Sequence, residues 1–173
     1  MSARPPADTG TADDINEGPV SLASLVLGPR WTCTTTGRSR AGVVLAMSRN
    51  DGTEVVAEVE RCCAGRLRHA YPVNAHDVEV RIADASSPEV LTDALGLLAR
   101  AVQAADPRCR RVVFAAPAGD PKAVAAAEAA GLRYVLDVDV PGADLSLLVA
   151  EPEWVTTADR DLDRVPGTLP PKL

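Results

Sequence analysis

The segment 84–132 restricts the possible folds more than any other part of this 173-residue chain, because it reads as helix, apolar strand and helix. Ser87 and Asp120 have side chains that accept hydrogen bonds from the first free amides of a helix, although Ser86 with Glu89 offers an alternative start. A proline follows both Ser87 and Asp120, and proline is favoured in the first helical turn. The pattern predicts helices at 88–105 and 121–130, a strand at 111–115, and Gly131 at the left-handed position that ends the second helix.

The residues before this segment predict an antiparallel meander with strands at 31–36, 41–49, 53–63 and 77–82. Asn50-Asp51-Gly52 tolerates positive φ angles and predicts a tight hairpin between the second and third strands. In the fourth strand, Val78 and Ile82 alternate with Glu79 and Arg81, which is typical of one covered face and one solvated face. Because a helix separates this strand from the strand at 111–115, the two strands should form a parallel pair with a right-handed crossover.

The residues after the second helix predict a closing antiparallel hairpin with strands at 134–140 and 145–150. We expect one domain at 20–151, a disordered leader at 1–19 and a Pro-rich, charged tail at 152–173, with 20–27 forming a short helix or an edge segment. The last strand is apolar, and an exposed apolar strand needs a cover. A homodimer that shares residues 145–151 is therefore a possible assembly.

Composition argues against several classes of partner. The net charge of −6 and the aromatic content of 3% disfavour nucleic acids, which require a basic footprint or exposed aromatic side chains. No run approaches the roughly 20 apolar residues of a membrane span, and no signal pattern is visible, so we expect a cytoplasmic protein without a membrane partner. The four cysteines match no zinc spacing, so no metal site is expected. A nucleophilic pair of Cys63 and His69 across a hairpin remains an alternative.

The run Ala126-Ala127-Glu128-Ala129-Ala130-Gly131-Leu132-Arg133-Tyr134 resembles the late helix and following strand of the Gcn5-related N-acetyltransferase (GNAT) family, with Leu132 where Phe is usual. The element order from 75 to 151 resembles the same family. The resemblance implies an α+β fold of the α/β three-layer type. Its sheet would be mixed and mostly antiparallel, with a central parallel strand pair and helices on its faces. The resemblance also implies transfer of an acyl group from acetyl-CoA or another acyl-CoA to a small-molecule or protein amine.

In this family the CoA pyrophosphate lies where the fourth strand meets the long helix, on a glycine-containing loop at a helix N-terminus. The resemblance makes Arg81, Ser86 and Ser87 the candidate cofactor-binding residues. The equivalent turn, 83–88, contains no glycine. Asp84 would repel a phosphate, and Pro88 lacks an amide donor. The turn therefore departs from the family pattern at the cofactor.

The candidate general bases are Glu58 and Glu79 on the meander strands, with Glu60, His69 and His76 nearby. For each carboxylate the simpler interpretation is a solvated strand face. The family often uses a tyrosine on its late helix as proton donor, but 123–130 has none. Tyr134 is the nearest candidate, and we also expect it to belong to the core. Two functions remain open: a divergent GNAT-family acyltransferase, or a catalytically inactive GNAT-like fold that serves as a binding or assembly partner.

Overall fold

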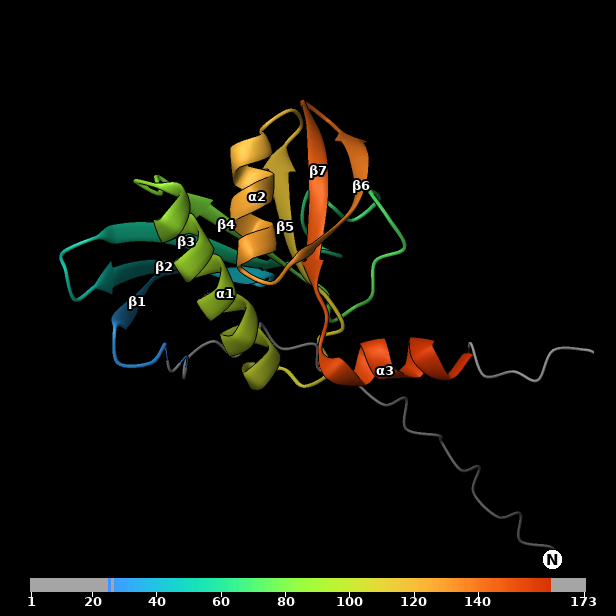
Figure 1. The fold of residues 1–173 in the computed structure, drawn as a ribbon, viewed down its shortest axis with the longest axis horizontal. Helices are drawn as coiled ribbons and strands as arrows, with labels where there is room; N and C mark the ends of the chain where they lie inside the picture. Colours follow the sequence, from blue (N-terminus) through green and yellow to red (C-terminus); the bar gives the residue numbers. More distant parts are fainter. Residues whose placement is uncertain (1–24, 26, 163–173) are drawn as a thin grey trace, which may run out of the picture.

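The computed structural model describes residues 25 and 27–162, which fold around one seven-stranded sheet (Figure 1). The strand order is β1-β2-β3-β4-β5-β7-β6. The strands are β1 (Trp31–Arg38), β2 (Gly42–Arg49), β3 (Glu54–Arg61), β4 (Val78–Ala83), β5 (Val112–Pro117), β6 (Arg133–Val140) and β7 (Ala143–Ala150). The helices are α1 (Pro88–Ala105), α2 (Pro121–Ala129) and α3 (Glu153–Leu162). This mixed sheet confirms the GNAT-like fold class expected from the sequence.

The antiparallel meander is confirmed, since β1 pairs with β2, β2 with β3 and β3 with β4 in that orientation. Gly52 has a φ of 87° in the β2–β3 turn, as its position requires. The expected leader at 1–19 lies outside the described residues. Of the segment 20–27, only Leu25 and Leu27 are described, and neither lies in a helix or strand.

The helix–strand–helix unit is also confirmed. The Ser87 hydroxyl accepts from the Val90 amide at 3.3 Å, so Ser87 rather than Ser86 starts α1. The Asp120 carboxylate starts α2 by accepting from the amides of Lys122 and Ala123, and Gly131 ends it with a φ of 95°. The parallel pair of β4 and β5 is present but short, because only the pairs Val78–Val112 and Glu79–Val113 are in register.

The two faces of the sheet are covered in different ways. Helices α1 and α2 pack side by side on one face over the larger apolar core. On the other face the third layer is the β3–β4 connection, residues 62–77, instead of a helix. Its Leu67 is fully buried with Val113, Leu147 and Val149 of β5 and β7. This connection therefore covers β5, β7 and β6 and, through Arg66, the first residues of β4.

The strand order corrects two expectations about the C-terminal hairpin. Strand β7 lies between β5 and β6, so the apolar strand near 145–151 is internal and cannot be the shared edge of a dimer. The edge strand is β6, whose Tyr134 is 44% exposed, so the expectation that Tyr134 belongs to the core is wrong. Both corrections have one cause, because a hairpin pattern predicts which strands pair but not which strand lies outermost.

The segment expected as a tail contains helix α3. Its Val155 is buried, whereas Trp154 is exposed with the Arg110 guanidinium 5.9 Å from its ring centroid. None of the helices in the described part of the chain is long and apolar enough to cross a membrane.

Asp106 ends α1 and collects several hydrogen bonds. Arg61 donates to its carboxylate at 2.7 Å, the His76 ring lies at 3.1 Å, and the Arg108 amide donates at 3.1 Å. Burial acts to raise the pKa of Asp106, but the hydrogen bonds from Arg61, His76 and Arg108 outweigh it and lower this pKa to about 2.

We expect the lowered pKa of Asp106 to make folding acid-sensitive. Because the folded-state pKa lies below the ordinary value of 3.8, the stabilisation is complete above about pH 5 and is lost as the pH falls through about 2. The loss should be about 2 kcal/mol in the free energy of unfolding, measured by urea denaturation at several pH values. Asp106→Asn should remove this loss, and Asp139→Asn on the edge strand β6 should retain it. An equal acid response in Asp106→Asn and the wild type would contradict the assignment.

Candidate functional site

The first turn of α1 is where the fold would receive the diphosphate of CoA, and its amide donors are already used. Pro88 has no amide hydrogen. The amide of Val90 donates to the Ser87 hydroxyl, and the amide of Leu91 donates to the Ser87 carbonyl. The Glu89 carboxylate lies against its own amide and the Ser87 hydroxyl, and these hydrogen bonds lower the pKa of Glu89. The turn therefore offers a carboxylate where a diphosphate would need free N–H groups.

The residues before α1 add to this mismatch. Asp84 has a φ of 57°, an uncommon conformation for a residue with a side chain, and it is exposed beside the helix start. Ser86 is exposed, and its hydroxyl has no hydrogen-bond partner among the described residues. Asp84 and Glu89 place two negative charges at the end of the helix that favours an anion. The residues present at this turn do not fit the diphosphate of CoA.

The candidate residues of the meander do come together, on the face of the sheet opposite α1. Glu58 and Arg81 are directly opposite each other on β3 and β4, and the Glu58 carboxylate accepts from Arg81 Nε at 3.0 Å. Arg81 Nη1 donates to Glu60 at 3.2 Å and to Glu79 at 3.1 Å. The other oxygen of Glu79 accepts from Arg66 Nε and Nη2 at 2.9 and 2.7 Å. These five residues form one carboxylate–arginine network.

The carboxylates of this network differ in burial. The Glu79 side chain is 1% exposed, so the expectation of a solvated face is wrong for Glu79. The 62–77 connection brings Arg66 over Glu79, and no pattern within β4 indicates that distant cover. The Glu58 side chain is 49% exposed, which confirms the solvated interpretation for Glu58. Arg81 is held by three carboxylates and is not available to a phosphate group.

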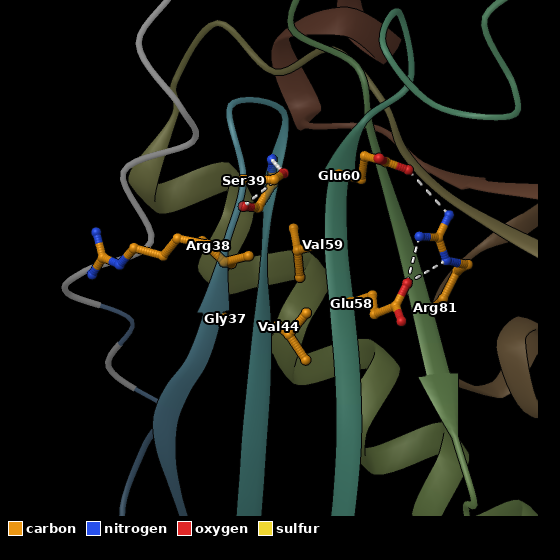
Figure 2. A pocket seen from close by; sticks show the side chains of 10 residues that line it. Gly37, Arg38, Ser39, Val44, Glu58, Val59, Glu60 and Arg81 are labelled. Carbon is orange, nitrogen blue, oxygen red and sulfur yellow. Dashed lines mark hydrogen bonds and ion pairs between the residues drawn. The ribbon is translucent and has the colours of Figure 1, made fainter.

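A shallow pocket of about 270 Å³ lies beside this network, at the end of the β1–β2 hairpin. Figure 2 shows Glu58, Glu60 and Arg81 along one side of it and Gly37, Ser39 and Val44 along the other. Arg81 contacts only one oxygen each of Glu58 and Glu60, and the second oxygen of each carboxylate has no hydrogen-bond partner among the described residues. The Arg38 side chain extends away from these carboxylates (Figure 2). The pocket therefore presents two carboxylate oxygens to solvent.

The remaining candidate residues lie apart from the pocket. Tyr134 is on β6, and β5 and β7 separate it from β4. Partial burial and the Asp137 carboxylate raise the pKa of Tyr134, which makes its hydroxyl a weaker acid. Ser86 and Ser87 lie at the start of α1, away from the Arg81 side chain. The structure thus brings Glu58, Glu79 and Arg81 together and leaves Tyr134, Ser86 and Ser87 elsewhere.

The alternative based on cysteine and histidine gains no support from the geometry. The Cys63 thiol lies 3.8 Å from the Ala75 carbonyl oxygen, and no hydrogen bond joins it to His69 in the described part of the chain. His76 binds Asp106 through Nδ1. Within residues 25 and 27–162, no group of three His, Cys, Asp or Glu side chains is arranged to hold a metal ion.

The parallel strands β4 and β5 pair over only a short distance. After Glu79 and Val113 the two parallel strands are no longer in register, and Figure 1 shows them diverging. Strand β4 remains paired with β3 as far as Ala83, and β5 remains paired with β7 as far as Pro117. The sheet therefore opens between its two halves. The resemblance to the GNAT family would place the pantetheine arm of CoA at this opening.

Several solved structures have a similar fold, among them an aminoglycoside acetyltransferase and an uncharacterized protein. Aminoglycoside acetyltransferase AAC(6')-Ib in complex with coenzyme A aligns with a TM-score of 0.57 and 13% identity, over 69% of this chain and 71% of that chain. The same enzyme with paromomycin and acetyl-CoA aligns at 0.56 and 12%, over 75% and 71%. An uncharacterized protein from Bacillus halodurans aligns at 0.56 and 13%, over 73% and 68%. No protein-family model matches the sequence, and no curated protein matches it significantly. The chain has a GNAT-like fold, and identities this low establish the fold alone.

Proposed function

We propose that this chain is a GNAT-like protein that binds or assembles with a partner and does not transfer acyl groups from CoA. The observation that carries the proposal is the first turn of α1. Its amides are used by Ser87, Pro88 contributes no donor, and Asp84 and Glu89 are negatively charged. A diphosphate at this turn would have to displace the helix cap and approach two carboxylates, and each change opposes binding.

The candidate catalytic groups support the same proposal. A general base needs a carboxylate oxygen within reach of the substrate amine. Both Glu79 oxygens are occupied by arginines, and the side chain is buried. Tyr134 lies on the far edge strand and has a raised pKa, so it is poorly suited to protonate a leaving thiolate. Neither Glu79 nor Tyr134 therefore combines the position and the free proton-transfer atom that the family's chemistry needs.

A divergent acyltransferase is the second candidate function, and two observations favour it. The opening between β4 and β5 remains, and the similar acetyltransferase structures hold coenzyme A or acetyl-CoA. In that case Glu58, with one oxygen facing the pocket, would be the base for an amine acceptor. The donor would then be an acyl-CoA whose diphosphate is held away from the α1 turn.

Calorimetric titration with acetyl-CoA tests the proposal. We expect no saturable heat at millimolar ligand, because the amides of the first turn of α1 are used and two carboxylates lie beside them. Longer acyl-CoAs should give the same result. Saturable binding with a Kd below about 1 mM would contradict the proposal. If binding were observed, Ser87→Glu would locate it, since a third carboxylate at the turn should abolish binding there and leave binding elsewhere unchanged.

A further inference from the structure

The sheet face opposite α1 is open over β1, β2, β3 and the end of β4 beyond Glu79, and we name it the outer face. Strand register places Thr34, Ala46, Val56 and Ala83 directly opposite one another across these four strands. All four side chains are exposed, and none is larger than valine. The 62–77 connection, which covers this side of the sheet over β5 and β7, does not bury them. The row forms a flat, weakly polar floor that another backbone could approach closely.

Strand β3 gives the outer face a negative charge. Glu54, Glu58 and Glu60 alternate with buried residues and therefore share this face. Arg81 and Arg66 pair with carboxylates of this face, and Arg66 is held by the buried Glu79. Arg38 also lines the pocket, but its side chain extends away from Glu58 and Glu60 (Figure 2). The four carboxylates of the face, including that of Glu79, are thus paired with two guanidinium groups. Glu58 and Glu60 line the pocket, and one oxygen of each carboxylate has no hydrogen-bond partner among the described residues, so the unbalanced charge is accessible.

The spacing of the two accessible carboxylates suggests what could bind them. Glu58 and Glu60 are two residues apart on one strand, which separates them by roughly 7 Å along the strand. In an extended peptide, side chains two residues apart have the same spacing and direction. Two basic side chains that are two residues apart in an extended segment could therefore reach both carboxylates, whereas the residue between them points away from the outer face.

We propose that the outer face binds an extended segment of a partner protein that carries basic side chains at alternate positions. This inference rests on the proposed function, because it names the partner of a GNAT-like binding protein. The segment 163–173 does not have the required spacing, because its basic side chains, Arg164 and Lys172, are eight residues apart. Charge disfavours two other occupants. A second copy docked through the same face would bring the same carboxylates together. The leader at 1–19 carries the charged side chains Arg4, Asp8, Asp13, Asp14 and Glu17, so it is acidic as well.

The test uses the full chain, isotope-labelled for NMR, and the end-capped peptide Lys-Val-Lys-Val-Lys at low ionic strength. We expect saturable chemical-shift changes at the amides of Ala46, Val56 and Glu58. The peptide Glu-Val-Glu-Val-Glu should produce none. Glu58→Gln combined with Glu60→Gln should weaken binding of the basic peptide at least fivefold. The matched pair Asp84→Asn and Glu89→Gln removes the same charge at the α1 turn and should change the Kd less than twofold.

Three outcomes would overturn the inference: no saturable shifts, shifts confined to regions outside β1–β4, or equal weakening in the two double variants. The amide spectrum of each variant shows whether it has kept the fold. Acetyl-CoA added to separate aliquots reports on the proposed function through the amides of Glu89, Val90 and Leu91. Shifts there with acetyl-CoA would contradict the proposed function without affecting the peptide result. The two failures are therefore distinguishable in one set of samples.

Discussion

Glu79→Gln is expected to lower the free energy of unfolding by about 3 kcal/mol, because it removes the only buried charge of the carboxylate–arginine network. The Glu79 side chain is 1% exposed and accepts from Arg66 at 2.7 and 2.9 Å and from Arg81 at 3.1 Å. Glutamine keeps the shape but leaves two guanidinium groups facing a neutral amide. It also loosens the 62–77 connection, which Arg66 ties to β4. Urea denaturation measures the effect as a shift in midpoint.

Glu58→Gln is the matched control, since it removes a charge from the same network at an exposed position. Its side chain is 49% exposed and pairs with Arg81. Exposed ion pairs contribute little, so the cost should stay below about 1 kcal/mol. If the two variants lowered the free energy of unfolding by similar amounts, burial of Glu79 by the 62–77 connection would not determine how much this network contributes to stability.

The helix–strand–helix unit could be predicted from sequence because each of its boundaries has a local cause. Ser87 and Asp120 accept from amides within three residues, and Gly131 supplies a positive φ where α2 ends. The hairpin at Asn50-Asp51-Gly52 is equally local. These features depend on neighbouring residues only, so a single sequence contains the information needed to place them.

The features that sequence did not predict depend on contacts between distant segments. Alternation in β4 indicated one covered face, but Glu79 is buried by Arg66 and the 62–77 connection, which approaches from the other side. Tyr134 was expected in the core, but the insertion of β7 between β5 and β6 leaves it exposed on the edge strand. The order of strands in a sheet and the covering of a sheet face by a loop are tertiary properties, and neither produces a periodic pattern in the sequence.

In the candidate site, too, the local feature could be predicted from sequence and the feature made by distant segments could not. The mismatch of the α1 turn with a diphosphate was visible in sequence, because Asp84, Ser87 and Pro88 are adjacent and their effects are local. The pocket could not be predicted from sequence. It lies between the β1–β2 hairpin and the side chains of Glu58 and Arg81, and only the pairing of the strands brings these distant residues together. Gly37 and Gly42 could have suggested it, since glycine within a strand often marks a bulge or a close backbone approach.

Gly42→Ala is expected to destabilise the fold by 3 kcal/mol or more, roughly 10 °C in Tm for a chain of this size. A Cβ atom on Gly42 would lie 2.2 Å from the Val59 carbonyl oxygen and 2.9 Å from the Glu60 Cα. Both atoms belong to the β3 backbone, which cannot rotate away as a side chain can. Strands β2 and β3 would have to separate at the closed end of the pocket, with loss of ladder hydrogen bonds beside Glu60.

Gly37→Ala tests whether the cost of Gly42→Ala comes from this backbone contact. Gly37 lines the same pocket from β1, but a Cβ there would meet only the Val44 side chain, at 3.4 Å. That contact is close to ordinary van der Waals distance, so Gly37→Ala should change the free energy of unfolding by less than about 1 kcal/mol. The Tm of both variants is measured by thermal unfolding, monitored by circular dichroism. A Tm for Gly42→Ala within about 3 °C of the wild type would mean that β2 and β3 are not packed as closely as this register requires.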